Sequence, residues 1–263
     1  MMEETNHQAD YQGEVQPALT PPPKRRRGVY ILPNLFTTAA LFAGFYAIIG
    51  AMQAKFEGAA IAIFAAMILD GLDGRVARLT NTQSDFGAEY DSLSDMVAFG
   101  VAPALLAYEW ALHSLGKVGW LAAFIYTTAA ALRLARFNTL IGIADKRYFQ
   151  GLPSPSAAAI VSAGVWIGVD LGIEGIQVDW LATFLTALAG LLMVSNFSYR
   201  SFKDLDLHNR VPFVVAILIM LVFALIYLHP PMILFLGFMT YALSGPVLGL
   251  LRLQQKRARR RER

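Results

Sequence analysis

The chain has 263 residues, of which 56% are hydrophobic and only 16% are charged, and its formal net charge is +3. Soluble domains average about 25% charged residues, and the apolar residues here occur in blocks that approach the roughly 20 residues needed for a membrane-spanning helix. This composition excludes an ordinary soluble fold. The absence of cysteine excludes disulfides, zinc–cysteine sites and iron–sulfur clusters.

The N-terminal residues 1–28 are polar, contain several prolines and end in the basic run 24–27. We expect this segment to be a disordered cytoplasmic tail. The apolar block that follows covers residues 29–51, which is too long for the apolar part of a signal peptide. We interpret it as the first transmembrane helix, and the basic run as a topology anchor rather than a nucleic-acid-binding patch.

About eight hydrophobic helices are predicted, so the expected fold is an all-α polytopic membrane bundle. In chain order they cover residues 29–51, 57–78, 92–113, 118–137, 156–169, 180–197, 211–228 and 232–251. Pro230 and Pro231 separate the last two helices. The membrane domain then covers residues 29–252, and residues 253–263 form a basic cytoplasmic tail.

The distribution of charge predicts the orientation of these helices. Eight spans with a cytoplasmic start put all of the 22 basic residues except Lys55 and Lys117 on the cytoplasmic side. The loop that contains Asp170, Glu174 and Asp179, which has no basic residue, falls outside. Cytoplasmic loops are enriched in Lys and Arg, so both termini are predicted to be cytoplasmic. No internal repeat is evident, which disfavours an inverted-repeat transporter.

Four aspartates lie where the second predicted helix ends and the third begins: Asp70, Asp73, Asp91 and Asp95. Their spacings of three and four residues put each pair on one helical face, and the short loop between the helices lets the pairs meet. Four carboxylates at one point repel one another unless cations lie between them. Sulfur-free carboxylate ligation suits magnesium, manganese or calcium, and two such ions suit a phosphoryl displacement.

These aspartates have two simpler interpretations. They could be solvated loop acids at the membrane edge, or a monovalent-cation site in a transporter. Gly71, Gly74 and Gly87 argue against both, because small residues let helices and a bulky ligand approach closely. Arg78 argues the same way, because its guanidinium can offer a fork of donors to a pyrophosphate.

The segment from Asp70 to Asp95 contains the pattern D-G-x-D-G-x2-A-R-x8-G-x3-D-x3-D. In this it resembles the CDP-alcohol phosphotransferase family of membrane enzymes. The resemblance implies that residues 29–252 are a catalytic domain that binds a CDP-linked lipid in the cytoplasmic (inner) membrane. It also implies two divalent metal ions as cofactors, Mg²⁺ or Mn²⁺, and a homodimer, with no nucleic-acid partner.

The resemblance further implies a role for each aspartate. Asp70 and Asp91 would bridge both metal ions, and Asp73 would complete the first metal site. Asp95 would bind the second ion and act as the catalytic general base on the acceptor hydroxyl. Five further residues are expected to contact the CDP part of the lipid: Asn34, Thr37, Gly74, Arg78 and Ser84.

Three more stretches resemble the phosphatidylserine synthase branch of this family: residues 131–138 (ALRLARFN), 151–158 (GLPSPSAA) and 195–206 (SNFSYRSFKDLD). The branch implies transfer of the phosphatidyl group from CDP-diacylglycerol to L-serine. Arg133 or Arg136 could pair with the carboxylate of serine, and Asn138 could hydrogen-bond the amino acid. Alternatively, the two arginines are topology anchors or partners of loop acids, and Asn138 caps a helix.

Three other functions stay open. The same chemistry could use glycerol 3-phosphate, inositol phosphate or a second lipid as acceptor, with cationic groups supplied by Lys146, Arg147, Arg200 and Lys203. A cation-coupled transporter would move ions across liposomes and release no CMP. A non-catalytic relative would only bind a CDP-linked lipid, but binding alone would not need Asp95.

Overall fold

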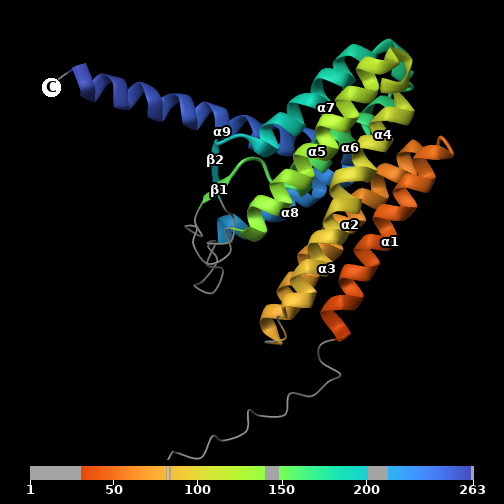
Figure 1. Cartoon of the computed structure of the whole chain (residues 1–263), viewed down its shortest axis with the longest axis horizontal. Coiled ribbons are helices and arrows are strands. Elements are labelled where there is room, and N and C mark those ends of the chain that lie inside the picture. Colours follow the sequence, from red (N-terminus) through yellow and green to blue (C-terminus); the bar gives the residue numbers. More distant parts are fainter. Residues whose placement is uncertain (1–30, 81, 83, 140–147, 201–212, 262–263) are drawn as a thin grey trace, which may run out of the picture.

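The helices of the protein form a bundle (Figure 1). The computed structural model describes residues 31–80, 82, 84–139, 148–200 and 213–261. Its α-helices are α1 (Ile31–Met52), α2 (Phe56–Leu79), α3 (Asp85–Asp95), α4 (Ala102–Trp110), α5 (Lys117–Thr139), α6 (Ser154–Asp170), α7 (Asp179–Val194), α8 (Phe213–Leu228) and α9 (Pro230–Arg261). The predicted all-α class is confirmed. The predicted tail 1–28 lies outside the described residues.

The third predicted helix begins earlier than the sequence indicated. It starts at Asp85 rather than at residue 92, and it runs as α3, a π-helical turn η2 (Met96–Val101) and α4. The oxygen of Ser84 accepts a hydrogen bond from the Gly87 N–H at 3.1 Å and so caps the first turn. The prediction followed the apolar periodicity, and the first turns of α3 are polar.

The last helix is longer than predicted. Residues 232–251 were expected, whereas α9 continues to Arg261 and runs away from the bundle (Figure 1). Its last turns are built from Gln, Lys, Arg and Ala, which all favour helix. The predicted basic tail, residues 253–263, therefore has a helical backbone as far as Arg261.

Small residues allow the helices to pack closely. A Cβ atom added to Gly44 of α1 would lie 2.7 Å from the Cα of Ala98 in η2. One added to Gly190 of α7 would lie 2.9 Å from the Cα of Tyr126 in α5. Helix α6 lies between α2, α4, α7 and α9, and most of its residues are buried. Such contacts are expected in a membrane, where the hydrophobic effect does not drive helices together and their association depends on close van der Waals packing.

Two short strands pair with each other. One follows α5 and the other follows α7, at the ends of these helices that are predicted to be cytoplasmic. Strand β1 (Tyr148–Gln150) pairs in antiparallel register with β2 (Ser198–Arg200), with Phe149 opposite Tyr199. The Tyr199 hydroxyl donates to the carbonyl of Ala242 in α9 at 3.0 Å. Burial, with Tyr241 alongside, raises the pKa of the Tyr199 phenol to about 12, so this donor stays protonated.

Among the described residues, three helical segments are long and apolar enough to cross a membrane: Pro33–Met52, Lys117–Thr139 and Pro230–Gly249. Asp179–Val194 is a shorter apolar helix. These segments indicate an integral membrane protein. The prediction of eight spans stays a prediction, because the remaining helices do not meet this standard of length and hydropathy.

Candidate active site

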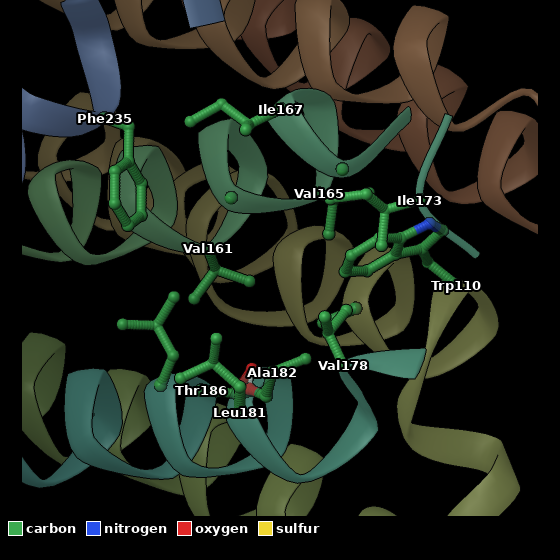
Figure 2. A pocket seen from close by; sticks show the side chains of 14 residues that line it. Trp110, Val161, Val165, Ile167, Ile173, Val178, Leu181, Ala182, Thr186 and Phe235 are labelled. Atoms are coloured by element: carbon green, nitrogen blue, oxygen red, sulfur yellow. Dashed lines mark hydrogen bonds between the residues drawn. The ribbon is translucent and has the colours of Figure 1, made fainter. Parts of the chain in front are cut away.

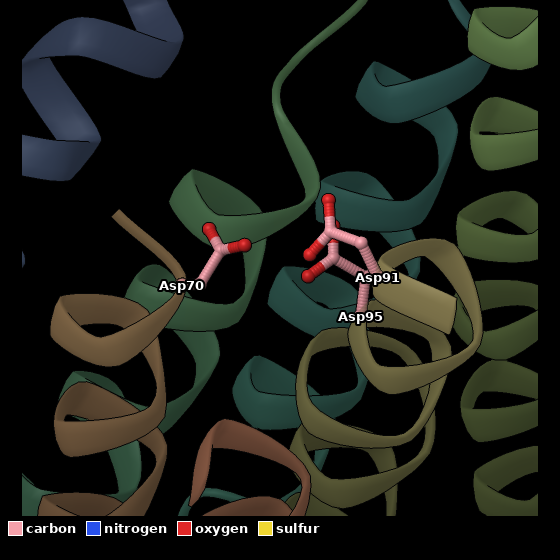
Figure 3. Close-up of side chains that lie close together, drawn as sticks. All are labelled: Asp70, Asp91 and Asp95. Atoms are coloured by element: carbon pink, nitrogen blue, oxygen red, sulfur yellow. The ribbon is translucent and has the colours of Figure 1, made fainter. Parts of the chain in front are cut away.

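Three of the four predicted aspartates converge. Asp70 projects from α2, and Asp91 and Asp95 project from α3, so that one ligand atom of each lies within 4.8 Å of the other two (Figure 3). All three side chains are partly buried. The spacing of four residues on α3 aligns Asp91 and Asp95 on one face, as the sequence predicted. The helices themselves bring that face to Asp70.

The connection between α2 and α3 positions this cluster. The N–H of Thr82 donates to the carbonyl of Ala77 at 3.0 Å, and the hydroxyls of Thr80 and Thr82 are 2.7 Å apart. These bonds satisfy the C-terminal end of α2, and Ser84 satisfies the N-terminal end of α3. The chain therefore reverses over a few residues and returns the second acid pair beside the first.

Asp73 is held separately from these three. Its side chain is buried, and its Oδ2 accepts a hydrogen bond of 2.7 Å from the hydroxyl of Thr37 on α1. It does not belong to the group within 4.8 Å, although its charge and that of Asp70 both repel the charge on Asp91. Thr37 thus orients Asp73. The sequence predicted a contact of Thr37 with the nucleotide and did not predict this hydrogen bond.

The donor set fits a hard divalent cation. The Asp91 Oδ1 atom is buried and has no hydrogen-bond partner among the described residues. A buried, unpaired carboxylate oxygen is costly unless a cation or another donor satisfies it. The converging ligands are all carboxylate oxygens, which Mg²⁺, Mn²⁺ and Ca²⁺ prefer. Asp70, Asp91 and Asp95 could therefore hold such an ion, with Asp73 beside them.

Arg133 brings a positive charge from α5 to this cluster. Its Nη1 donates to the hydroxyl of Ser154 at 2.7 Å, and its guanidinium interacts electrostatically with Asp95. Its Nε atom is buried and lacks a hydrogen-bond partner among the described residues. Ser154, the first residue of α6, is completely buried. The sequence had not singled out Ser154, and its signal was the run GLPSPSAA around it.

The other two residues predicted to bind serine have partners within the protein. Arg136 donates to the side-chain oxygen of Gln150 on β1 and to that of Asn196 at 3.2 Å. The Nδ2 of Asn138 donates to the hydroxyl of Ser92, next to Asp91, at 3.0 Å. Both contacts tie the end of α5 to its neighbours. Lys146, Arg147 and Lys203, named for other acceptors, lie outside the described residues.

The residues predicted to contact CDP lie at the same end of α1, α2 and α3 as the acids. A Cβ atom added to Gly87 would lie 3.6 Å from the side-chain oxygen of Asn34, so α3 approaches α1 closely there. One added to Gly74 would lie 3.7 Å from the Nη1 of Arg78, whose side chain is exposed. Ser84 caps α3. These groups therefore lie at the end of the bundle that holds the acids, and their contact with the CDP part stays a prediction.

A separate cavity of about 230 Å³ lies between α4, α6, α7 and α9 (Figure 2). Its lining is apolar and includes Trp110, Val161 and Phe235. The polar atom of Thr186 in this wall donates to its own helix, to the carbonyl of Ala182, at 2.8 Å. The lining residues of α6 begin at Val161, about two turns after Ser154. The cavity therefore has no group suited to the chemistry of the acid cluster.

Comparison with known proteins gives a consistent result. A family model described as CDP-alcohol phosphatidyltransferase matches residues 30–195. A Helicobacter pylori protein named CDP-diacylglycerol–serine O-phosphatidyltransferase is 41% identical, over 74% of this chain and 82% of its own. Proteins of the same name from Mycobacterium leprae and Methanocaldococcus jannaschii are 32% and 40% identical, over 87% and 54% of this chain and 78% and 63% of their own.

Proposed function

Because the chain belongs to the CDP-alcohol phosphatidyltransferase family, we propose that it transfers the phosphatidyl group of CDP-diacylglycerol to L-serine. The products are phosphatidylserine and CMP. The observation that carries this proposal is the convergence of Asp70, Asp91 and Asp95 within 4.8 Å, at the end of the bundle that also holds Arg133. The names of the similar proteins support serine as the acceptor.

The four aspartates would hold two divalent ions, Mg²⁺ or Mn²⁺. Asp70 and Asp91 are assigned to both ions, Asp73 to the first and Asp95 to the second. When bound, such ions neutralise the pyrophosphate and stabilise the charge that develops on the attacking and leaving oxygens. The hydrogen bond from Thr37 to Asp73 supports this assignment, because an oriented carboxylate offers its remaining lone pairs in a fixed direction.

The CDP part of the lipid is assigned to Asn34, Thr37, Gly74, Arg78 and Ser84, and Thr37 also orients Asp73. Arg78 is exposed at the end of α2 and can offer two parallel donors to phosphate oxygens. Gly74 leaves space beside that guanidinium, because a side chain there would approach its Nη1 atom. The acyl chains of the substrate remain in the lipid while the pyrophosphate lies at the acids.

Arg133 is the residue best suited to bind the carboxylate of serine. Its guanidinium lies beside Asp95, and its Nε donor is buried and has no partner among the described residues. A buried donor of this kind favours an anionic ligand, because pairing recovers the cost of removing it from water. Arg136 and Asn138 are already bonded to Gln150, Asn196 and Ser92, so we assign them to holding the end of α5 near the acceptor.

The chemistry proposed is a single displacement. Asp95 accepts the proton of the serine hydroxyl, whose oxygen forms a new bond to the lipid-side phosphorus. The bond from that phosphorus to the bridging oxygen of the pyrophosphate breaks, and CMP leaves with that oxygen. Most of the acceleration comes from positioning and charge stabilisation. One displacement inverts the configuration at phosphorus, so retention of configuration would exclude this route.

The test is CMP release by purified protein in detergent, with CDP-diacylglycerol and one acceptor at a time. We expect release with L-serine, and loss of release when EDTA is added and recovery when excess Mg²⁺ or Mn²⁺ follows. Release with glycerol 3-phosphate or inositol phosphate, and none with serine, would overturn the acceptor. Ion flux across liposomes without CMP release from folded, metal-loaded protein would overturn the enzyme assignment in favour of a transporter.

The proposal also assigns an orientation and an assembly. Both termini and the acid cluster are on the cytoplasmic side of the inner membrane, as the distribution of Lys and Arg supports. Residues 29–252 form the catalytic domain between two cytoplasmic tails. The family resemblance supports a homodimer, which light scattering of the protein in detergent, with the detergent mass subtracted, would establish or reject.

A further inference from the structure

The helix that carries Asp91 and Asp95 changes its hydrogen-bonding pattern immediately after Asp95. Residues Met96–Val101 form the π-helical turn η2, in which the N–H of Ala102 donates to the carbonyl of Val97. A π turn holds one more residue than an α turn, and such turns occur frequently at functional sites. The role of this turn depends on how its backbone carbonyls are satisfied and on how it packs against α1 and α5.

Pro103 explains why the carbonyl of Phe99 needs an external partner. In an α-helix the N–H of residue 103 would donate to the carbonyl of residue 99, but proline has no N–H. The hydroxyl of Tyr126 on α5 donates to that carbonyl instead, at 3.0 Å. Tyr126 and Phe99 are completely buried, and so is Pro103. Water therefore cannot substitute for the tyrosine hydroxyl.

The turn is also fixed by its neighbours on two sides. Gly44 of α1 lies so close to Ala98 that a Cβ atom there would come within 2.7 Å of the Ala98 Cα. On the other side, a Cβ atom added to Gly100 would lie 3.2 Å from the Cβ of Ala130 on α5. The π turn is thus held between α1 and α5, with Tyr126 as its hydrogen-bonding partner.

This geometry determines where the acids point. Each residue of an α-helix advances the chain by about 100° around the axis. If the π turn reverted to α geometry while α4 stayed packed, α3 would rotate by about one residue, or about 100°, relative to α4. Asp91 and Asp95 would then turn away from Asp70, with which they now lie within 4.8 Å.

We propose that Tyr126 is a positioning residue, which donates to the carbonyl left without a partner by Pro103, holds the π turn in place and thereby aims Asp91 and Asp95 at Asp70. The Tyr126 hydroxyl donates to the backbone of Phe99, and it interacts electrostatically with Arg133. The proposal deepens the proposed function and rests on it for the link to turnover. Its link to cation binding rests on the acid cluster alone.

The test compares Tyr126→Phe with wild type in detergent, using Mn²⁺ titration followed by electron paramagnetic resonance without any substrate. We expect the Mn²⁺ affinity to fall about 10-fold or more, the usual effect of losing a group that orients metal ligands. CMP release should show a lower kcat. Unchanged Mn²⁺ affinity in Tyr126→Phe would overturn the proposal.

Tyr199→Phe is the matched control. It removes another completely buried hydroxyl that donates to a main-chain carbonyl at 3.0 Å, far along the chain in β2. Both variants should lose a similar amount of thermal stability. Only Tyr126→Phe should lose Mn²⁺ affinity, and an equal loss in the two variants would reduce the role of Tyr126 to general stability.

A second pair of variants separates satisfaction of the carbonyl from the π turn itself. Pro103→Ala restores an N–H that can donate to Phe99 as in an α-helix. We expect Pro103→Ala combined with Tyr126→Phe to regain Tm but not Mn²⁺ affinity, whereas recovery of both would overturn the proposal.

If Tyr126→Phe does not fold, Pro103→Ala alone tests the proposal. A lower Mn²⁺ affinity than that of wild type is then expected, and an affinity equal to that of wild type would contradict the proposal. Wild type that binds Mn²⁺ but releases no CMP would overturn only the proposed function.

Discussion

At the scale of single residues, the acids of the candidate site differ in the groups that surround them. Asp73 is bonded to Thr37, whereas Asp95 shares its surroundings with Asp70, Asp91 and Arg133. Like charges this close require a cation or a proton to coexist, and the adjacent guanidinium offsets part of the repulsion. The function of each acid therefore depends on groups that are distant in the sequence.

Asp95→Asn tests the assignment of the general base. The amide keeps the shape of the side chain but cannot accept the proton of the acceptor hydroxyl, so we expect kcat to fall roughly 100- to 10,000-fold. CMP release per folded molecule measures it, with Glu89→Gln as the control. Glu89 is an exposed carboxylate on the same helix and outside the cluster. Near-normal turnover in Asp95→Asn would remove Asp95 from this role.

Ser154→Ala tests whether a held guanidinium binds the acceptor. Removing the 2.7 Å hydrogen bond to Arg133 should raise the KM for L-serine about 10-fold, the effect of losing one bond to a charged group. The KM for CDP-diacylglycerol should change little. Ser154→Thr, which keeps the hydroxyl, should recover part of the affinity.

The control for this change lies on the same helix. The hydroxyl of Ser162 is buried without a hydrogen-bond partner among the described residues, so Ser162→Ala should leave both KM values unchanged and cost no stability. A rise in the KM for CDP-diacylglycerol in Ser154→Ala, with that for serine unaltered, would reassign Arg133 to the lipid substrate.

At the scale of elements, the close approach of α1 to η2 leaves no space for a side chain at Gly44. Gly44→Ala should destabilise the protein by about 1–3 kcal/mol, because its Cβ would lie 2.7 Å from the backbone of Ala98. Gly58→Ala on α2 is the matched control, because nothing lies within 4 Å of an added Cβ atom there. The Tm of both variants in detergent, measured by tryptophan fluorescence, compares them. Equal Tm values would show that α1 and η2 can separate without cost.

The helices were predictable to different degrees, for physical reasons. Apolar periodicity marks buried or lipid-facing turns, so the predicted first helix, residues 29–51, agrees with α1 (Ile31–Met52) within a few residues. It does not mark α3, whose polar turns are stabilised by the Ser84 cap and by packing on α1. The π turn η2 was not predicted either, because its signal is distributed between Pro103 and a tyrosine on another helix.

At the scale of the whole molecule, orientation in the membrane is the property that the distribution of charge predicts most directly. The chain contains no cysteine, so single cysteines can be introduced without background. Thr139→Cys at the end of α5 should react with a membrane-impermeant maleimide only after the cells are opened. Glu174→Cys, in the acidic loop before α7, should react on intact cells. The reverse pattern would contradict cytoplasmic termini and a cytoplasmic site.

The sequence by itself determined the class of the protein and the chemistry of its site. Long apolar blocks exclude a soluble fold because a bilayer-spanning helix must be apolar along its length. Four acids at helical spacing, with glycines and Arg78 between them, indicate a cation-assisted phosphoryl transfer. The acids can hold divalent ions, which stabilise the attacking and leaving oxygens of such a reaction. The first conclusion rests on the length of the apolar blocks, and the second on local spacing along two consecutive helices.

Only the tertiary structure decided how these groups are held. Three hydrogen-bonded pairs join different helical elements, and no local sequence pattern predicts them. They are Thr37 with Asp73, Arg133 with Ser154, and Tyr126 with Phe99. Each pair exists because close packing leaves a buried polar atom that must find a partner nearby. Sequence periodicity gives the face on which a residue lies, whereas the residue that it meets depends on how the helices pack against one another.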